Sequence, residues 1–273
     1  MPGWLVKLRE LHDEAFEFDW ESHLAALNSR LRLTGQGELC SSVAGHPPVW
    51  FNGDVEMIVP GCWTLVISLN HQKGPPEGYP GPFSPQQYWD FWRRHNVVYG
   101  WLPFLSPLIH VVAPAMGDAV PEAAGEQRLY ATDRMVFVEL CPYASSRFTV
   151  AWRDVLLLSR TDPGFMRAAE VFKLLIEGAE PGLIIAHGNP CVWIMDDVHR
   201  HHLMWSEVEY VSAAREGKRL HHKQGLIRLN GGNTLPIIGL PFLGRARSHN
   251  GYAEYAQLGG MLRAFCESLS KRR

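Results

Sequence analysis

Four short apolar runs along this 273-residue chain constrain its fold more than any other feature of the sequence. Each run is rich in β-branched and aliphatic residues, and most of the sequence between the runs has helical patterns. Strands that are apolar on both faces are typical of parallel sheets covered by helices on both sides. The runs are Thr64–Leu69, Arg134–Leu140, Gly182–Ala186 and Thr234–Leu240. They predict an α/β fold, a three-layer sandwich with a short, mainly parallel sheet of four strands.

Each apolar run leads into a polar loop that contains glycine or proline. The four loops read SLNHQKG, LCPYASSR, AHGNP and LPFLGRARSH. In open parallel sheets, ligands bind outside the carboxyl ends of the strands, where such loops meet. The sequence therefore places a ligand site at this edge of the predicted sheet.

Helix signals surround these runs. Trp4 to Leu33 has apolar residues at helical spacing and predicts one or two amphipathic helices. Ser84 before Pro85, and Asp162 before a helix over 163–177, are N-cap signals. A final helix carries Leu258, Met261, Leu262, Phe265 and Leu269 on one face. Together with the strands, these elements predict alternating strand and helix along most of the chain.

Two other segments contain residues that favour turns or irregular structure. Asn52-Gly53 lies between apolar flanks, and this pair predicts a β-hairpin over residues 49–59. Residues 100–128 are rich in proline, and we expect them to be irregular. Residues 100–128 and 199–230 then read as insertions into one domain that spans 1–273.

Composition favours a soluble protein of the cytoplasm. Hydrophobic residues make up 46% and charged residues 20% of the chain, which is ordinary for a globular domain. The five cysteines show no CxxC pairing, so we expect reduced thiols. The longest apolar stretch, Leu102–Met116, contains three prolines and is too short to span a bilayer. We expect a monomer without a membrane partner.

Basic residues gather in one part of the chain. Residues 214–249 hold seven Lys or Arg against Glu216 alone, whereas residues 1–60 are acidic. A localised basic stretch in a nearly neutral protein is typical of a phosphate-binding face. A solvated loop balanced by the acidic N-terminal region is the alternative, and the sequence leaves both open.

Candidate binding residues lie in the loops after the strands. Asn70 offers one acceptor and two donors on a short side chain, so it can hold a water molecule or a substrate group, or else turn the chain. The rings of Tyr79 and Phe83 either stack on a planar ligand or pack against other side chains of the protein. Arg245 and Arg247 suit phosphate, with a solvated basic turn as the alternative.

Motifs of several enzyme classes are absent from the sequence. It has no GxGxxG in a strand–turn–helix context, no GK[ST] and no GxSxG. His199, His201 and His202, with Asp196 and Asp197, have no recognised metal-ligand spacing, and a polar helix end is the simpler interpretation.

The order of the four loops resembles the uracil-DNA glycosylase superfamily. Val66 to His71 looks like the Gly-Ile-Asn-Pro run of its mismatch-specific branch, with Asn70 on the catalytic Asn and His71 in place of Pro. Val138 to Tyr143 occupies the place of the base-recognition strand, and Leu240 to Arg247 looks like a diverged form of the loop that wedges into DNA.

The resemblance implies a DNA glycosylase that flips a base out of the helix and hydrolyses its N-glycosidic bond. It implies that Asn70 holds the attacking water while His71 stabilises the leaving base. It implies no metal and no cofactor, and DNA as the partner. One branch of the superfamily excises glucosylated hydroxymethylcytosine in anti-phage defence. The two insertions would suit the enlarged pocket that such a bulky base needs. The implied base pocket comprises Gln72, Tyr79, Phe83, Glu139, Tyr143 and His187. The implied DNA contacts are Phe242, Arg245, Arg247 and His249.

Two other functions remain open at this point. A metal-dependent phosphoesterase or nuclease would use the cluster at 196–202. A non-catalytic nucleic-acid-binding domain would use the same basic stretch without cleaving any bond.

Overall fold

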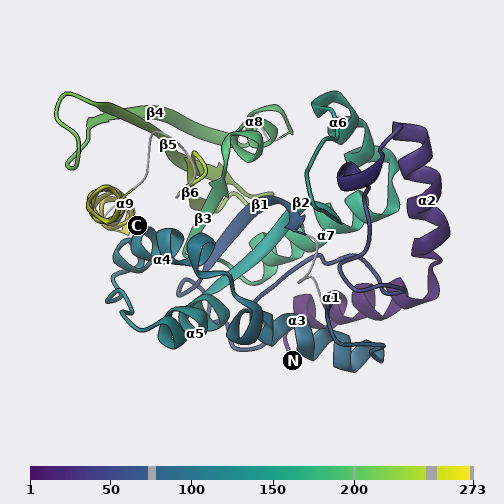
Figure 1. Ribbon diagram of the computed structural model, residues 1–273. Helices are drawn as coiled ribbons and strands as arrows, with labels where there is room; N and C mark the ends of the chain where they lie inside the picture. Colours follow the sequence, from purple (N-terminus) through teal and green to yellow (C-terminus); the bar gives the residue numbers. More distant parts are fainter. Residues whose placement is uncertain (73–77, 199–200, 244–250, 271–273) are drawn as a thin grey trace.

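A single mixed sheet forms the centre of the molecule (Figure 1). The structure is a computed structural model that describes residues 1–72, 78–198, 201–243 and 251–270. Six strands pair in the order β2-β1-β3-β6-β5-β4. Their bounds are β1 Thr64–Gln72, β2 Met135–Ser145, β3 Leu183–His187, β4 Leu203–Val211, β5 Arg219–Arg228 and β6 Thr234–Leu240.

The α/β class is confirmed, but the predicted number of strands is wrong. The four apolar runs are β1, β2, β3 and β6, and they lie side by side and parallel. The hairpin β4–β5 adds two antiparallel strands beyond β6. Along most of β4 half-buried positions alternate with exposed ones, and along β5 buried or half-buried positions do so, as expected for a hairpin with one solvated face. The sheet therefore has two more strands than the four apolar runs predict, and these two are joined to it by antiparallel pairing.

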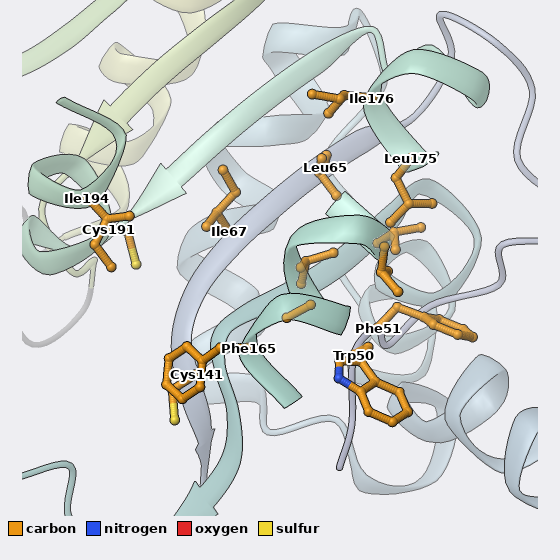
Figure 2. Packing of buried hydrophobic residues seen from close by; sticks show 14 of the residues in the cluster. Trp50, Phe51, Leu65, Ile67, Cys141, Phe165, Leu175, Ile176, Cys191 and Ile194 are labelled. Atoms are coloured by element: carbon orange, nitrogen blue, oxygen red, sulfur yellow. The ribbon is translucent and has the colours of Figure 1, made fainter. Parts of the chain in front are cut away.

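Helices cover both faces of the sheet. The first face, which we call the α7 face, packs its core against helices near the N-terminus and against α7 and α8. Figure 2 shows part of this core, with Leu65 and Ile67 of β1 between Leu175 of α7 and Ile194 of α8. The opposite face, the α4 face, packs against α4, α5 and α9. The helix bounds are α1 Gly3–Glu14, α2 Trp20–Leu31, α3 Pro85–Tyr99, α4 Leu102–Met116, α5 Ala124–Arg134, α6 Trp152–Thr161, α7 Pro163–Gly178, α8 Asn189–Val198 and α9 Tyr252–Ser270.

The helix starts follow the sequence signals closely. Ser84 accepts a hydrogen bond from the Gln87 amide, and the Gln87 side chain accepts from the Ser84 amide, which completes a capping box at α3. Asp162 accepts from the amides of Gly164 and Phe165 at the start of α7. The predicted N-terminal segment forms two helices, α1 and α2.

The Pro-rich segment 100–128 is not irregular, which corrects the sequence prediction. Residues Leu102–Met116 form α4, and Ala124 begins α5. Pro107 and Pro114 lie inside α4, where each removes one backbone donor. Most of α4 is buried against the sheet and α9, and this burial outweighs the lost hydrogen bonds.

The predicted hairpin over 49–59 is also wrong. Asn52 forms an isolated antiparallel bridge with Phe137 of β2, through two backbone hydrogen bonds of 2.9 and 2.8 Å. Gly53 has a positive φ of 133°, and a side chain there would collide with the backbone of β2. The Asn-Gly pair therefore brings this segment against the outer edge of β2 rather than folding it back on itself.

Candidate active site at the carboxyl edge of the sheet

A row of three polar side chains crosses the sheet near the carboxyl ends of its parallel strands. Ser68 of β1 is the register partner of Glu139 of β2. On its other side, Ile67 pairs with Ala186, so Ser68 lies level with the next residue of β3, His187. Register partners in a sheet share a face, and neighbouring strands lie about 4.8 Å apart. Glu139, Ser68 and His187 therefore stand in one line, which we call the polar row.

The polar row lies on the α4 face and is almost fully buried. Val66 and Phe137, two residues before Ser68 and Glu139, belong to the core of this face, and strand alternation keeps the row on the same side. Ser68 and Glu139 are each 7% exposed, and His187 is 1% exposed. Buried polar groups are almost always hydrogen-bonded. Among the described residues, Ser68 Oγ, Glu139 Oε2 and His187 Nδ1 have no partner.

Burial alters the charge of Glu139. Desolvation raises the pKa of the Glu139 carboxyl to about 8. At neutral pH the side chain therefore carries its proton, and it presents one O–H donor beside one carbonyl acceptor.

His187 is neutral for the same reason and has a defined tautomer. Burial lowers the pKa of its imidazole to about 3. The Leu243 amide donates a 3.1 Å hydrogen bond to His187 Nε2, so Nε2 is an acceptor and the ring proton resides on Nδ1. The unpartnered Nδ1–H is thus a donor at the β3 end of the polar row.

Two aromatic rings border the His187 end of the row. The Phe242 ring lies 4.6 Å from the His187 ring, centroid to centroid, at an interplanar angle of 31°. The Phe104 ring of α4 lies 5.3 Å from His187 and 5.8 Å from Phe242. Phe242 is half-buried in this stack, so the predicted DNA contact is also part of the packing around His187.

The residues predicted to be catalytic follow Ser68 on β1. Strand β1 does not end before Asn70, as the sequence suggested, but continues through His71 to Gln72. The Asn70 backbone pairs with Cys141 of β2, two positions beyond the pair Ser68–Glu139. The side chains of Asn70, His71 and Gln72 lie outside the described part of the chain. The register partner of Asn70, Cys141, packs in the core of the α7 face, which is the face opposite the polar row.

Tyr143, another predicted pocket residue, lies apart from the polar row. Its hydroxyl donates a 2.6 Å hydrogen bond to Asp162, the N-cap of α7, and lies 3.3 Å from His23 Nε2. Its ring lies 5.8 Å from the Phe165 ring in the core of the α7 face. Burial, followed by the neighbouring Asp162 carboxylate, raises the pKa of the Tyr143 hydroxyl. Tyr143 thus joins β2 to the start of α7.

Tyr79 and Phe83 pack in a third cluster against α3. The Tyr79 hydroxyl lies 3.0 Å from His95 Nε2, and desolvation raises its pKa to about 12. The Phe83 ring lies 5.0 Å from Phe91 of α3 and 5.7 Å from His46. These contacts show that both rings pack against neighbouring side chains. Of the predicted pocket residues, Glu139 and His187 are the two that the sheet brings together.

Carboxylates pair with three residues of the basic stretch. Arg215 forms an ion pair with the fully buried Glu254 of α9, with 2.6 Å between Nη2 and Oε2. Carboxylates also pair with two further basic residues of the stretch, Glu209 with Arg219 and Asp196 with Lys223. The carboxylates of these three pairs lie between residues 196 and 254, and not in the acidic region 1–60 that the sequence suggested. Arg245, Arg247 and His249 lie outside the described residues.

The proposed metal cluster gains no support. Asp196 accepts a 2.8 Å hydrogen bond from Trp205 Nε1 in addition to its pair with Lys223. Within the described ranges, no group of three or more His, Cys, Asp or Glu side chains is arranged to hold a metal ion. All five cysteines are free, as predicted.

A groove opens next to the first turns of α4. Its volume is about 520 Å³. Three helices contribute their N-terminal ends to its walls, since α4, α5 and α9 all begin there. Phe104 of the same α4 turn contacts His187, so the groove and the polar row share one structural element. The lining residues are Leu102, Pro103, Ser106, Pro107, Glu122, Ala124, Gln127, Gly251, Tyr252 and Tyr255.

Sequence reasoning missed Ser68 and Phe104. Ser68 lies inside an apolar run, and its alignment with Glu139 depends on the pairing of Thr64 with Met135, which the sequence did not give. Phe104 was hidden in the segment predicted to be irregular.

No single helix in the described ranges is long and apolar enough to cross a membrane. Helices α3 and α4 reach the required length and hydropathy only when they are taken together, and they meet at a bend of 93°. No protein-family model matches the chain, and no curated protein sequence matches it.

Proposed function

We propose that this protein is a DNA glycosylase, which extrudes a base, in particular a modified base of phage DNA, and hydrolyses its N-glycosidic bond. The observation that carries the proposal is the polar row, because three buried polar atoms without partners are costly unless a ligand satisfies them. The row lies at the carboxyl edge of parallel strands, where α/β proteins bind ligands. The resemblance of the strand-end loops to uracil-DNA glycosylases supplies the reaction class.

The chemistry of the row suits a departing base. Cleavage of the glycosidic bond builds negative charge on the base and positive charge on the sugar. A neutral Glu139 and the Nδ1–H of His187 are donors in a site without bulk water, where hydrogen bonds to developing negative charge are strongest. Asn70, two residues further along β1 than Ser68, would hold the attacking water.

The groove beside α4 suits the neighbouring part of the DNA. Tyr252 is exposed and its ring lies 4.6 Å from that of His110, so an aromatic surface borders the groove. Bases stack on such rings in proteins that bind unpaired nucleotides. The N-terminal ends of α4, α5 and α9 point their amide dipoles toward the same space, which favours phosphate over a cation there.

Release of bases from DNA tests the proposal directly. Purified protein is incubated with phage DNAs of different base modification in the presence of EDTA, and abasic sites are counted. We expect abasic sites in at least one DNA, and full activity in EDTA argues against the phosphoesterase alternative. Asn70→Ala should lower base release by orders of magnitude with little change in DNA affinity. Asn233→Ala, at an exposed asparagine of the turn before β6, is the matched control.

Tight DNA binding without abasic sites from any substrate would instead favour the non-catalytic binding domain. Near-normal base release by Asn70→Ala would move the catalytic role to another residue.

A further inference from the structure

Strand β4 forms one end of the sheet, and no strand in the described part of the chain pairs with its outer edge (Figure 1). Two backbone hydrogen bonds show which of its residues point outward. The Arg228 amide donates to the His202 carbonyl over 2.7 Å, and the Ser212 amide donates to the Lys218 carbonyl over 2.8 Å. Both pairs continue the β4–β5 register. Even-numbered residues of β4 therefore bond to β5, and odd-numbered residues point their N–H and C=O groups outward.

The free stretch of this edge ends before Val211. The Val211 carbonyl accepts a 2.7 Å hydrogen bond from Gln257 Nε2 of α9, which occupies that end of the strand. The other outward-facing residues of β4 are Leu203, Trp205, Glu207 and Glu209. With two groups on each of four residues, eight backbone groups have no hydrogen-bond partner among the described residues. Open edges of this kind pair readily with another strand.

The usual protection of an edge strand is absent from β4. Its sequence, LMWSEVEYV, contains no lysine and no proline, and its nine pairs with β5 run without a bulge. Its two charges already have partners on β5, because Glu209 forms an ion pair with Arg219 and a Glu207 oxygen lies 2.8 Å from His221 Nδ1. The edge is therefore long, regular and nearly neutral.

Apolar side chains flank the same edge. Met204 of β4 is 44% exposed, and Trp193 of α8 is 57% exposed. Asp196, one turn after Trp193, accepts a 2.8 Å hydrogen bond from Trp205 Nε1 and thereby holds α8 beside β4. Exposed apolar groups next to unpaired backbone are typical of a surface that another chain covers.

We propose that β4 pairs antiparallel with β4 of a second copy of this chain, which joins the two sheets into one. The free stretch is centred on Ser206, so a two-fold axis there pairs Leu203 with Glu209 and Trp205 with Glu207 across the interface. Each of these pairs exchanges two hydrogen bonds, and together they use all the free groups of both copies.

The side chains also favour a second copy over an unrelated strand. An axis at Ser206 places Met204 opposite Val208, an apolar contact on both sides of the axis. No glutamate then lies opposite a glutamate, whereas an axis at Glu207 would oppose like charges. The proposed dimer replaces the monomer that the sequence suggests, and it does not depend on the proposed reaction.

Sedimentation velocity over a concentration series measures the association, and we expect the intact protein to pass from monomer to dimer. Glu207→Pro removes an outward N–H and leaves the β4–β5 hydrogen bonds in place. It should weaken association about tenfold or more, because one hydrogen bond is lost at each of two symmetric positions. Glu207→Gln keeps that N–H and removes only the carboxylate. It is the matched control and should dimerise like the intact protein.

Cysteine cross-linking tests the register itself, in a Cys62→Ser background that removes an exposed thiol. Ser206→Cys places a thiol on the two-fold axis, where the residues of a pair without mutual hydrogen bonds are close enough for a disulfide. We expect covalent dimers under mild oxidation. Glu209→Cys lies opposite Leu203 in this register and should stay uncoupled. This test stands even where Glu207→Pro fails to fold.

Two results would overturn the inference. A monomer at every concentration would leave the edge to an extended segment of another protein. A dimer that Glu207→Pro does not weaken and Ser206→Cys does not cross-link would have its interface elsewhere. Base release from DNA is measured separately, so neither result bears on the proposed reaction.

Discussion

The buried acid Glu139 should make the stability of this protein fall as the pH rises. In the unfolded chain its carboxyl titrates near 4.5, whereas burial raises its pKa in the folded protein to about 8. Between these values the folded state retains a proton that the unfolded state has lost. The free energy of unfolding therefore declines with pH across this window and levels off above it. Glu139→Gln removes this titration and should flatten the decline.

The size of the effect follows from the two pKa values. Each pH unit that separates the folded pKa from the unfolded pKa corresponds to about 1.4 kcal/mol. Between pH 5 and pH 8, most of the interval lies inside the window, so the intact protein should lose about 3–4 kcal/mol relative to Glu139→Gln. Other groups titrate alike in both proteins, so their contributions cancel in this comparison. A difference of this size is a large part of the stability of a single domain.

Urea denaturation at pH 5, 6, 7 and 8 measures the difference between the two proteins. The advantage of Glu139→Gln should grow steadily over the series. The exposed variant Glu170→Gln should run parallel to the intact protein. Parallel curves for Glu139→Gln and the intact protein would refute the reasoning, since they would mean that the Glu139 carboxyl ionises as easily in the folded state as in water.

Three further changes probe other contacts. Tyr143→Phe leaves Asp162 one donor short and should lower the free energy of unfolding by about 1–2 kcal/mol in urea, with unchanged nucleoside binding; impaired binding would restore Tyr143 to the base pocket. Phe242→Ala removes the ring next to His187 and should lower the melting temperature; an unchanged melting temperature with slower base release would instead indicate a wedge in DNA. Glu254→Gln strips Arg215 of its buried carboxylate and should speed amide exchange over residues 212–218 at the tip of the β4–β5 hairpin; unaltered exchange there would mean that the pair does not anchor the tip.

The parallel part of the fold was predictable, because apolar strands and helix caps are local signals. Thr64–Leu69 and the capping residues Ser84 and Asp162 appear in the structure nearly as predicted. The hairpin β4–β5 was not predictable in the same way. Charged and apolar residues are interspersed along this hairpin, and the segment forms two strands because β5 pairs with β6. Helix α4 was missed because proline opposes a helix locally, whereas the burial that favours it depends on α9 and the sheet.

The residues of the candidate site were likewise only partly predictable from the sequence. Glu139 and His187 were named from the sequence because they lie at strand ends, which is a property of the chain order. Tyr143 and Phe83 were named on the same grounds, but the first faces α7 and the second packs on α3. Which face a strand-end residue occupies depends on register, and register is set by contacts between distant strands. That information lies in the pairing of β1 with β2 and β3.

The central place of β1 has a consequence for the way the chain folds as it is made. Thr64 pairs with Met135 on one side and with Leu183 on the other, about 70 and 120 residues further along the chain. At ordinary rates of translation, β1 emerges roughly 6–24 s before its second neighbour. Throughout that interval a strand that is apolar on both faces has an open edge, which invites pairing with other nascent chains. Slower synthesis between residues 135 and 187 should therefore lower the yield of soluble protein, and a chaperone that binds apolar strands should restore it.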